Sequence, residues 1–558
     1  MSAQPMSETR TGSGSAPEKI KVARQVVEAL RDMGVRYVFG VPSGGWVDYM
    51  EAMRVTEGID FVLTTHEGTA AIMADVCGRL NGAPGVCFGT FGPGATNLST
   101  GVGGALLDRS PLIALTDEMQ AAMRGRVTQM GIDHQALFAP ITKKTTRLES
   151  DKVREILFDA ATIALGGRPG SVHVGLPVGM SAEYSSPRTD LPLPQAGVVG
   201  NAPVAVAKQM QAALQAARKP VLALGLGAVR AGVGDEISRF AEEHHIPVVV
   251  TPMAKGMIAE DHPCYAGVLF HALSDEVGKT HQQSDLVVLI GYDPVEFNVE
   301  SWAPNVKVVN VDDQPLDLDR TAYPDVIEVT GTITSGVAAL CATEMATKDW
   351  DVEALKARRQ AMFERLKGAD EFGPCAVLDV LREVLPEDGI MTCDVGAHTH
   401  LIGQKWPTPA PGRQIMTNGW STMGFGIPAA IAAKLCRPNV DVCTVVGDGG
   451  FLMSAGELAT AVRLGLPIVT IVITDNDLAL IRIKQQKKQN PIYGTPIRAA
   501  GTIGGDNIFG VPVLTASERD GFRNALKKAF ATSGPMIVEA LVSSREYDEL
   551  VLKKDKPN

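Results

Sequence analysis

The sequence has few cysteines and no long apolar run. Its 558 residues include eight cysteines, and these form no C-x-x-C pair and no zinc-ligand spacing, which is typical of reduced thiols in a cytoplasm. No apolar run approaches the roughly 18 residues that a membrane span needs. The longest candidate, residues 466–473, ends at Thr474-Asp475 and reads as a buried strand. We therefore expect a cytoplasmic protein that does not bind membranes.

The sequence also lacks an excess of positive charge. Lys and Arg total 52 against 63 Asp and Glu, and the formal net charge is −11. Because nucleic-acid phosphates demand a basic face, this balance argues against a nucleic-acid partner. Apolar residues make up 45% of the chain and the mean hydropathy is +0.07, so we expect a well-buried globular protein.

The first 18 residues lack the apolar segment of a signal peptide. They are rich in Ser, Gly, Thr and Pro, and they carry Glu8 and Glu18 beside a single Arg, which disfavours a transit peptide. We expect residues 1–18 to be a disordered tail.

The rest of the chain is too long for one core and divides into three parts. Short β-branched runs alternate with helical stretches from about Lys19 onward, which predicts parallel α/β sheets. A Pro- and Ser-rich stretch, residues 185–203, separates the first part from the second, and a charged helix over residues 352–367 follows the second. The predicted boundaries are 19–185, 203–342 and 370–546, with a C-terminal tail at 547–558.

The strongest motif is a glycine-rich turn after a buried strand. Val445-Val446 leads into Gly447-Asp448-Gly449-Gly450, and a second apolar strand, residues 468–473, delivers Asp475. We expect a helix over residues 454–464 between them. The glycines allow close approach of a phosphate, and the paired carboxylates suit Mg²⁺. The alternative interpretation is an ordinary glycine turn after a Rossmann-like strand, and the second acidic strand end argues against it.

This pair of strand ends resembles the thiamine-diphosphate motif of the acetolactate synthase and pyruvate decarboxylase superfamily. The resemblance implies that Asp448 and Asp475 bind Mg²⁺ through their side chains and Asp477 through its carbonyl. The superfamily usually has Asn where this chain has Asp475. The FAD-independent, catabolic acetolactate synthases are similar in using Asp there, and in the Gln/Lys-rich stretch of residues 485–488.

A second acidic residue, Glu67, lies between an apolar strand and an Ala-rich helix. Such a residue is usually a helix-start carboxylate favoured by the macrodipole. The resemblance instead implies that Glu67 is catalytic, since the superfamily has its essential acid in a matching His-Glu segment followed by a glycine turn, here residues 91–98. Glu67 would hydrogen-bond N1′ of the cofactor's aminopyrimidine and promote loss of the thiazolium C2 proton.

Further site residues follow from the same resemblance, each at a matching motif. His398 would receive the diphosphate, and Ser421 and Met423 would meet the pyrimidine, with Met423 as the apolar support that bends the cofactor. Plain core packing is the alternative for Met423. The remaining predictions are Gln129 as a catalytic pocket residue, and a substrate pocket formed by Ser43, Gly44, Trp46, Ile481 and Lys484.

The resemblance also implies the architecture and the assembly. It predicts three doubly wound parallel-sheet α/β domains, namely pyrimidine-binding, central Rossmann-like and diphosphate-binding. Glu67 and Asp448 would meet only across the interface of a homodimer, and tetramers are common among similar enzymes. Thiamine diphosphate and Mg²⁺ are the expected cofactors. No FAD is expected, because Gly291-Tyr292-Asp293-Pro294 replaces an Arg-bearing flavin segment.

The expected reaction is decarboxylation of a 2-oxo acid such as pyruvate, followed by addition to a second carbonyl compound. The first part has no adjacent His-His pair, and Ile481 stands where simple decarboxylases have a proton-donating Glu. Trp46 and Lys484 differ from the catabolic enzymes and leave the acceptor open. The alternatives are a decarboxylase that releases aldehyde, a C–C lyase or hydrolase that acts on a diketone, and a non-catalytic relative that only binds the cofactor.

Overall fold

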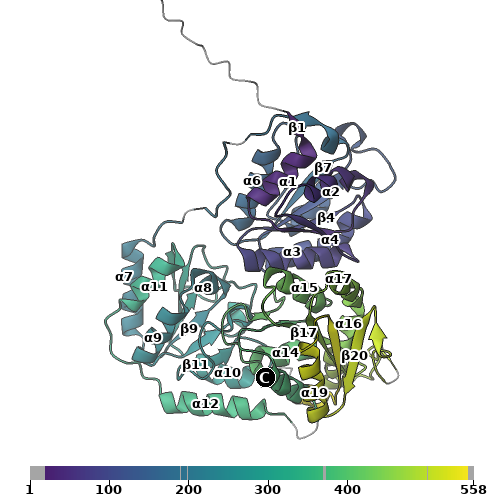
Figure 1. Ribbon diagram of the computed structural model, residues 1–558. Coiled ribbons are helices and arrows are strands. Elements are labelled where there is room, and N and C mark those ends of the chain that lie inside the picture. Colours follow the sequence, from purple (N-terminus) through teal and green to yellow (C-terminus); the bar gives the residue numbers. More distant parts are fainter. Residues whose placement is uncertain (1–18, 189, 198, 369–371, 499–500, 551–558) are drawn as a thin grey trace, which may run out of the picture.

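Three α/β units follow one another along the chain (Figure 1). The computed structural model describes residues 19–188, 190–197, 199–368, 372–498 and 501–550. The tail predicted at 1–18, and the part of the other tail beyond residue 550, lie outside the described residues. Each unit is built on a sheet of parallel strands with helices against it, which confirms the predicted fold class.

The first unit has a six-stranded sheet in the order β3-β2-β4-β5-β7-β6, and all its pairs are parallel. Its inner strands β2, β4, β5 and β7 are mostly buried because helices cover both faces, whereas the edge strand β6 is polar and partly exposed. The strands are β2 (Tyr37–Gly40), β3 (Asp60–Leu63), β4 (Gly85–Gly89), β5 (Leu112–Glu118), β6 (Lys144–Arg147) and β7 (Ser171–Pro177); the helices are α1 (Val22–Asp32), α2 (Val47–Arg54), α3 (Glu67–Asn81), α4 (Pro93–Leu107), α5 (His134–Phe138) and α6 (Val153–Leu165).

The central unit repeats the pattern with the order β11-β10-β9-β12-β13-β14. The carboxyl ends of these strands face the other two units. The strands are β9 (Pro220–Leu224), β10 (Val248–Val250), β11 (Tyr265–Val268), β12 (Leu286–Ile290), β13 (Lys307–Asp312) and β14 (Val326–Thr330); the helices are α7 (Val204–Ala216), α8 (Leu226–Ala231), α9 (Gly234–His244), α10 (Ser274–His281) and α11 (Ile333–Cys341), and α12 (Val352–Arg365) leads to the third unit.

The third unit has seven strands in the order β16-β15-β17-β18-β21-β20-β19, parallel except for the β19–β20 pair. The strands are β15 (Ile390–Cys393), β16 (Gln414–Ile415), β17 (Val442–Gly447), β18 (Ile468–Thr474), β19 (Asn507–Ile508), β20 (Val511–Ala516) and β21 (Met536–Leu541); the helices are α13 (Pro374–Val384), α14 (Ala397–Lys405), α15 (Gly426–Cys436), α16 (Asp448–Ser454), α17 (Leu458–Arg463), α18 (Ala479–Lys487), α19 (Arg519–Phe530) and α20 (Arg545–Leu550).

The helix expected at residues 454–464 is wrong in its start. Helix α16 begins at Asp448, directly at the end of β17, and a 3-10 turn at Ala455–Glu457 joins it to α17. Two glycines make the first turn of α16 a poor helix by propensity. Asp448 compensates, since its carboxylate stands at the positive end of the helix and accepts the backbone N–H of Gly449 at 2.9 Å.

The first and third units pack against each other through α3 and α15, which lie side by side (Figure 1). Arg79 on α3 is the polar centre of this contact. Its guanidinium donates to Asp75 at 2.7 and 2.8 Å, to Asp108 at 2.9 Å and to the Met416 carbonyl at 2.6 Å. Burial alone would lower the pKa of Arg79, but Asp75 and Asp108 raise it above its ordinary value.

A buried carboxylate forms a second contact between the same units. Oε1 of Glu457 accepts hydrogen bonds from the Thr65 N–H at 2.9 Å and from the hydroxyls of Thr65 and Thr69, each at 2.5 Å. Its Oε2 accepts from Thr460 at 2.8 Å. The two threonines of the first unit flank Glu67 in sequence, so the segment that follows Asp448 contacts the segment that carries Glu67.

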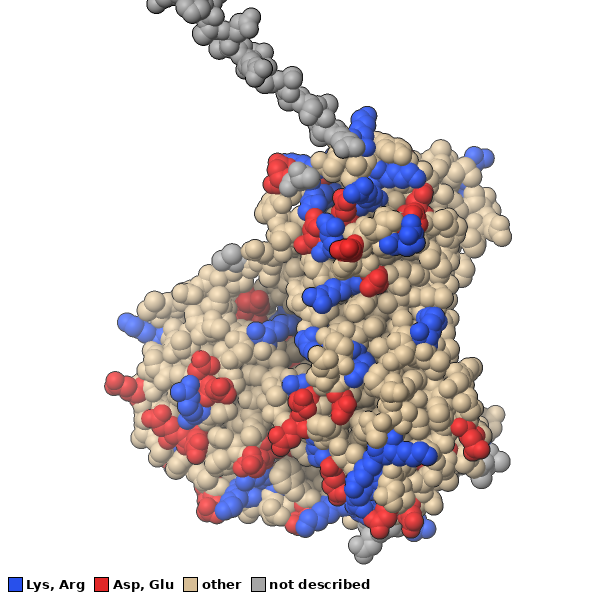
Figure 2. Space-filling view, in the orientation of Figure 1, with Lys and Arg blue, Asp and Glu red and all other residues tan. Residues whose placement is uncertain are grey.

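The surface bears both signs of charge. On the face that Figure 2 shows, Lys, Arg, Asp and Glu side chains gather mainly at the top and along the lower part, where both signs are mixed. Across the described residues, the helices are all too short or too polar to cross a membrane.

Arg79→Leu should lower the free energy of unfolding by about 3–5 kcal/mol, because two buried carboxylates would lose their cation. Urea-induced unfolding followed by tryptophan fluorescence measures this change. Arg54→Leu is the matched control, since the Arg54–Glu51 pair is 70% and 60% exposed and an ion pair in water contributes little to stability. Equal losses in the two variants would contradict a structural role for Arg79.

Candidate active site

The glycine-rich turn lies at the carboxyl end of β17, where open α/β sheets bind ligands. Asp448 is buried there, and its Oδ2 accepts the backbone N–H of Asn476 at 2.7 Å. Gly450 has no room for a side chain, since an added Cβ would lie 2.7 Å from Oδ2 of Asp394. Burial raises the pKa of Asp448 above its ordinary value. The turn therefore presents backbone N–H groups and one buried carboxylate to the same space.

The neighbouring strand β18 delivers the second acidic group. Asp475 follows this strand directly, and burial together with the nearby Asp448 raises the pKa of Asp475 to about 7. Asn476 adopts a left-handed conformation (φ 62°) that turns the chain back at this edge. Oδ2 of Asp475 and Oδ1 of Asp477 are buried and have no hydrogen-bond partner. Unpaired buried carboxylate oxygens are costly, and a hard cation such as Mg²⁺ would satisfy them.

These groups surround a cavity of about 130 Å³. His398, at the start of α14, lines it with its Nε2 buried and unpartnered. Burial lowers the pKa of His398 to about 4, so the ring is neutral at pH 7 and can donate one hydrogen bond to an anion. Nine of the predicted residues meet here: His398, Met423, Gly447, Asp448, Gly449, Gly450, Asp475, Asp477 and Ile481.

The loop before α15 forms one wall of this cavity. Met423 reaches toward the glycine turn, and its Cε would lie 3.5 Å from a Cβ added to Gly449. Ser421 is in the left-handed region (φ 54°), and its hydroxyl donates to the Asn418 carbonyl at 2.8 Å. The hydroxyl of Ser421 is therefore used within its own loop, so any contact of Ser421 with a ligand would be made by its backbone groups. Ser421 itself does not line the cavity.

Asp394 supports this loop and was missed by the sequence analysis as a site residue. It is buried at the end of β15, and its carboxylate accepts the Gly424 N–H at 2.9 and 3.1 Å. Burial raises the pKa of Asp394 to about 6. The signal was available, because an acid at the end of an apolar strand is the pattern that identified Asp448.

Glu67 is the first residue of α3 and is buried in the first unit. Its Oε2 accepts from Nδ2 of Asn97 at 2.9 Å, and Gly94 of the glycine turn lies against its Oε1. His66 caps the helix by accepting the Gly68 N–H at 3.0 Å. Asn97 was not predicted, although it belongs to the glycine turn at residues 91–98. All residues around the cavity come from the third unit, so one chain does not bring Glu67 to Asp448.

The predicted substrate-pocket residues divide into two groups. Ile481 lines the cavity from α18, and Lys484 lies one turn further on, exposed to solvent. Ser43 is in the first unit and donates to Asp117 at 2.5 Å, and Gly44 is exposed beside it. Gln129 lies in an exposed loop of the first unit, also away from the cavity.

The prediction for Trp46 is corrected. Its indole is 1% exposed and stacks on Phe88 with ring centroids 3.8 Å apart, and Tyr49 covers it at 4.6 Å. A Gly-Gly-Trp sequence does not reveal that the third residue turns inward at the start of α2. Trp46 therefore packs into the core of the first unit next to the glycine-bearing residues 40–45, the first glycine loop, and does not line a pocket.

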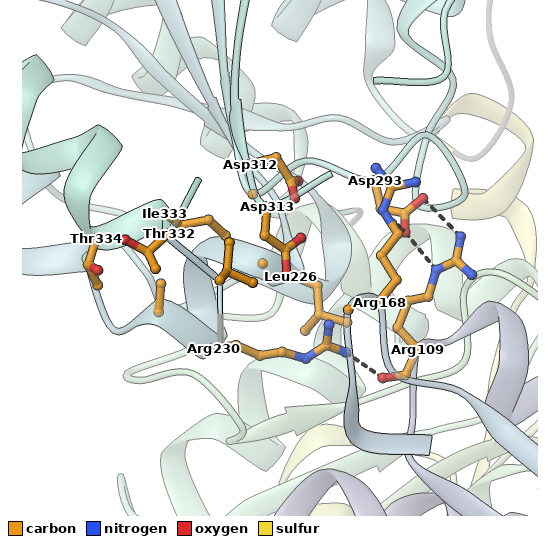
Figure 3. Close-up of a pocket in the computed structure, with 15 residues that line it drawn as sticks. Arg109, Arg168, Leu226, Arg230, Asp293, Asp312, Asp313, Thr332, Ile333 and Thr334 are labelled. Carbon is orange, nitrogen blue, oxygen red and sulfur yellow. Dashed lines mark hydrogen bonds and ion pairs between the residues drawn. The ribbon is translucent and has the colours of Figure 1, made fainter. Parts of the chain in front are cut away.

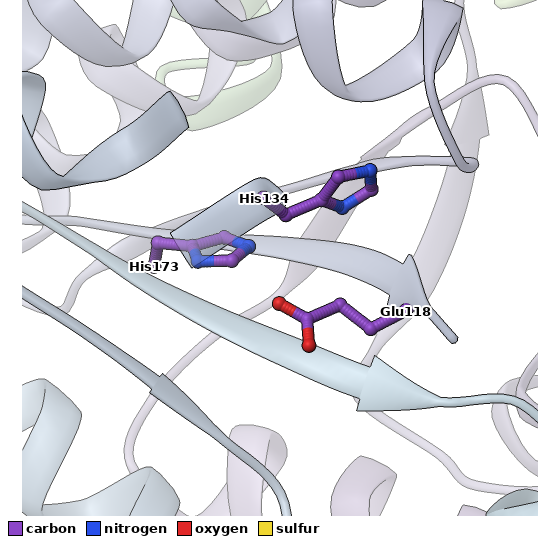
Figure 4. Close-up of side chains that lie close together, drawn as sticks. All are labelled: Glu118, His134 and His173. Carbon is purple, nitrogen blue, oxygen red and sulfur yellow. The ribbon is translucent and has the colours of Figure 1, made fainter. Parts of the chain in front are cut away.

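Close to Gln129, the first unit has a buried polar cluster of Glu118, His134 and His173 (Figure 4). His173 lies on β7 and His134 begins α5; neither was predicted as a site residue. Thr116 contacts both rings, at 2.9 Å from His134 Nδ1 and 2.8 Å from His173 Nε2. Burial lowers the pKa of both histidines.

This cluster is arranged as a hydrogen-bond network. Glu118 accepts from Arg147 and Gln135, each at 2.5 Å. The second nitrogen of His173 contacts Thr145 at 2.7 Å, and that of His134 accepts the Gly92 N–H at 3.3 Å. Every ring nitrogen is occupied, so the cluster holds the Gly92 turn and offers no vacant ligand to a metal.

The central unit has a larger cavity, of about 260 Å³, at the carboxyl ends of its strands (Figure 3). Asp293 pairs with Arg109 at 2.6 Å and with Arg168 at 3.5 Å, and Arg230 points into the same space (Figure 3). Burial, and then its neighbour Asp313, raises the pKa of Asp312 to about 7. The segment at residues 291–294 thus binds two arginines of the first unit through Asp293.

Known proteins match this chain along almost its whole length. Families described as the N-terminal TPP binding, central and C-terminal TPP binding domains of thiamine pyrophosphate enzymes match residues 20–137, 207–340 and 394–540. A probable acetolactate synthase large subunit of Methanocaldococcus jannaschii is 31% identical over 94% of this chain and 93% of its own. The acetolactate synthase of Bacillus subtilis is 30% identical over 96% of this chain and 95% of its own length. The catabolic acetolactate synthase of Raoultella terrigena is 30% identical over 93% of this chain and 95% of its own length. The chain therefore belongs to the thiamine pyrophosphate enzymes, as a relative of the acetolactate synthases.

Proposed function

We propose that this enzyme uses thiamine diphosphate and Mg²⁺ to decarboxylate a 2-oxo acid, pyruvate in the first instance, and to join the remaining fragment to a second carbonyl compound. The unpaired carboxylate oxygen of Asp475 beside buried Asp448 carries the proposal, because two neighbouring carboxylates suit a divalent cation that would bind a diphosphate. The end-to-end similarity to acetolactate synthases supports the reaction class. We place the enzyme in the cytoplasm.

Different residues of the cavity would bind the metal ion and the diphosphate of the cofactor. Asp448 and Asp475 would hold the metal through carboxylate oxygens, and Asp477 would add its carbonyl. Neutral His398 would donate to the diphosphate, whose other oxygens would meet the N–H groups of the glycine turn. When bound, thiamine diphosphate supplies an electron sink for the C–C bond that breaks. Met423 would support the bent cofactor from the side.

Glu67 would complete the site from a partner subunit. It would exchange a proton with N1′ of the aminopyrimidine, and Asn97 fixes the direction of its carboxylate. Because Glu67 lies outside the cavity of its own chain, we propose a homodimer at minimum, with a homotetramer as the fuller assembly. Leu452 and Met453 on α16 support this, since they are 58% and 61% exposed directly beside the site.

The choice between products would depend on proton delivery near α18. Ile481 cannot protonate the fragment that remains after decarboxylation, so addition to a carbonyl is favoured over aldehyde release. The pKa of the nearby His400 is lowered to about 3 by burial, by His271 and by Lys484, so His400 is no acid at pH 7. Lys484 would place a positive charge where an anionic acceptor enters, beside the Ser43-Gly44 loop and Gln129 of the partner.

The cofactor-free protein should regain activity only when thiamine diphosphate and Mg²⁺ are both added, and added FAD should change nothing. Asp448→Ala should weaken cofactor retention at least 100-fold, because the metal loses a buried ligand. Equilibrium dialysis measures retention. Asp520→Ala, at an exposed helix start, is the control and should bind as the wild type does. Full cofactor retention by Asp448→Ala would refute the metal site.

Glu67→Gln should keep the fold and the cofactor but slow exchange of the thiazolium C2 proton by about 10²–10⁴-fold, since general acid–base catalysis is removed. NMR of quenched samples in deuterated water follows this exchange. Glu57→Gln, at an exposed position of the same unit, should exchange at the wild-type rate. If Glu67→Gln also exchanged at that rate, Glu67 would be a helix-start residue only.

With pyruvate alone, 2-acetolactate should be the main product, because Ile481 carries no proton that could release the two-carbon fragment as an aldehyde. Chromatography of acetolactate, acetoin and acetaldehyde during pyruvate consumption decides the point. Acetaldehyde as the main product would replace the proposal by simple decarboxylation. Absence of pyruvate turnover would favour another 2-oxo acid or a C–C bond of a diketone as substrate.

A further inference from the structure

Two thiols face each other where the first unit meets the third. Cys77 lies on α3 and Cys436 is the last residue of α15, and their Sγ atoms are 3.2 Å apart although 359 positions separate them in sequence. Cys77 is buried and Cys436 is half-buried. All eight cysteines are free, and among the described contacts this is the one between two thiols.

We propose that Cys77 and Cys436 form a reversible disulfide when the enzyme meets hydrogen peroxide, and that this bond links the first unit covalently to the third. The thiols need to approach by only about 1 Å, since a disulfide bond is about 2.05 Å long. Side-chain rotation supplies such a movement between two helices that already lie side by side. Oxidation therefore requires no rearrangement of the fold.

The surroundings make Cys436 the more reactive thiol. Asn81 donates its side-chain N–H to Cys436 Sγ at 3.2 Å. The pKa of Cys436 is lowered, first by its contact with Cys77. The hydrogen bond from Asn81 and the positive charges of Arg437 and Arg36 lower it further. The same thiol–thiol contact, together with burial, raises the pKa of Cys77 well above its ordinary value. Thiolates are the nucleophiles of cysteine chemistry, so Cys436 attacks first and Cys77 resolves.

The oxidation proceeds in two balanced steps. The Cys436 thiolate attacks one oxygen of hydrogen peroxide, an S–O bond forms, the O–O bond breaks, and hydroxide leaves and takes up a proton to become water. The sulfur of Cys77 then attacks the Cys436 sulfur, the S–S bond forms, the S–O bond breaks, and the second oxygen leaves with the Cys77 proton as water. The two thiols lose two electrons and the peroxide gains them. A small-molecule dithiol reverses the bond by exchange.

Peroxide can reach the pair from the protein surface. A small cavity of about 10 Å³ opens beside Cys77, Tyr37 and Asn81, which is close to the space that one water-sized molecule needs. Cys436 is itself partly exposed at the end of its helix. Cys341 gives a matched comparison, because it is also half-buried but contacts a carbonyl, that of Glu236, and no thiol.

The test uses the full chain with its cofactors. Reduced enzyme is treated with one to two equivalents of hydrogen peroxide, remaining thiols are blocked with iodoacetamide, and non-reducing tryptic peptides are analysed by mass spectrometry. A peptide pair joined through Cys77 and Cys436, 2 Da lighter than the two free peptides and lost after dithiothreitol, is the expected result. Cys341→Ser should give the same pair, and Cys436→Ser should give none.

The order of attack has its own readout. In Cys77→Ser the sulfenic acid has no resolving thiol, so dimedone should label Cys436, whereas the wild type should show at least ten-fold less label at that position. Cys77→Ala repeats the test with a different side chain, should the serine be poorly tolerated. The proposal would be overturned if the wild type gave no linked peptides, or if either cysteine were linked to another thiol instead. It would also be overturned if dimedone labelled Cys77 in Cys436→Ser but never labelled Cys436 in the Cys77 variants.

Discussion

The candidate active site depends on one electrostatic constraint: a buried carboxylate, Asp448, and a half-buried one, Asp475, stand at adjacent strand ends. Strands β17 and β18 are parallel and in register up to Gly447 and Ile473, so the residues that follow them, Asp448 and Asp475, must leave the sheet together. Among the described residues, the one ion pair to these two carboxylates is the long contact of Arg498 with Asp448, at 3.8 Å. Such a pair of carboxylates is stable only with protons or with a cation. Three features of the backbone place the two carboxylates side by side: the glycine turn, the left-handed conformation of Asn476 and the start of α16 at Asp448.

The sequence predicted the strands well, because parallel strands covered on both faces are continuous apolar runs. It also predicted most of the residues that surround the cavity of the third unit, since strand ends at one edge of a sheet converge whatever the loops do. The start of α16 was wrong because Gly449 and Gly450 have low helix propensity, and only the three-dimensional position of Asp448 favours a helix there.

Side-chain direction was harder to predict than position. Trp46 was placed correctly in the first glycine loop, but only the packing against Phe88 shows that it points inward. Asn97 and Asp394 act through hydrogen bonds to residues far away in sequence or in loops, and such pairings leave no periodic signal. For Gln129, Ser43 and Gly44 a single chain supplies no neighbour from the other half of the site, so their roles stay predictions.

The contact of Glu457 has an evolutionary consequence. One buried carboxylate accepts from Thr65, Thr69 and Thr460, which belong to two different units and to segments near Glu67 and Asp448. Replacing a member removes a hydrogen bond from this network, and loss of Thr460 leaves the buried Oε2 of Glu457 without its donor, which costs about 1–3 kcal/mol. Single substitutions at these four positions should therefore be rare, and lineages that change one should have changed the others with it. Thr65, Thr69, Glu457 and Thr460 should therefore be inherited together, although nearly four hundred positions separate the first from the last.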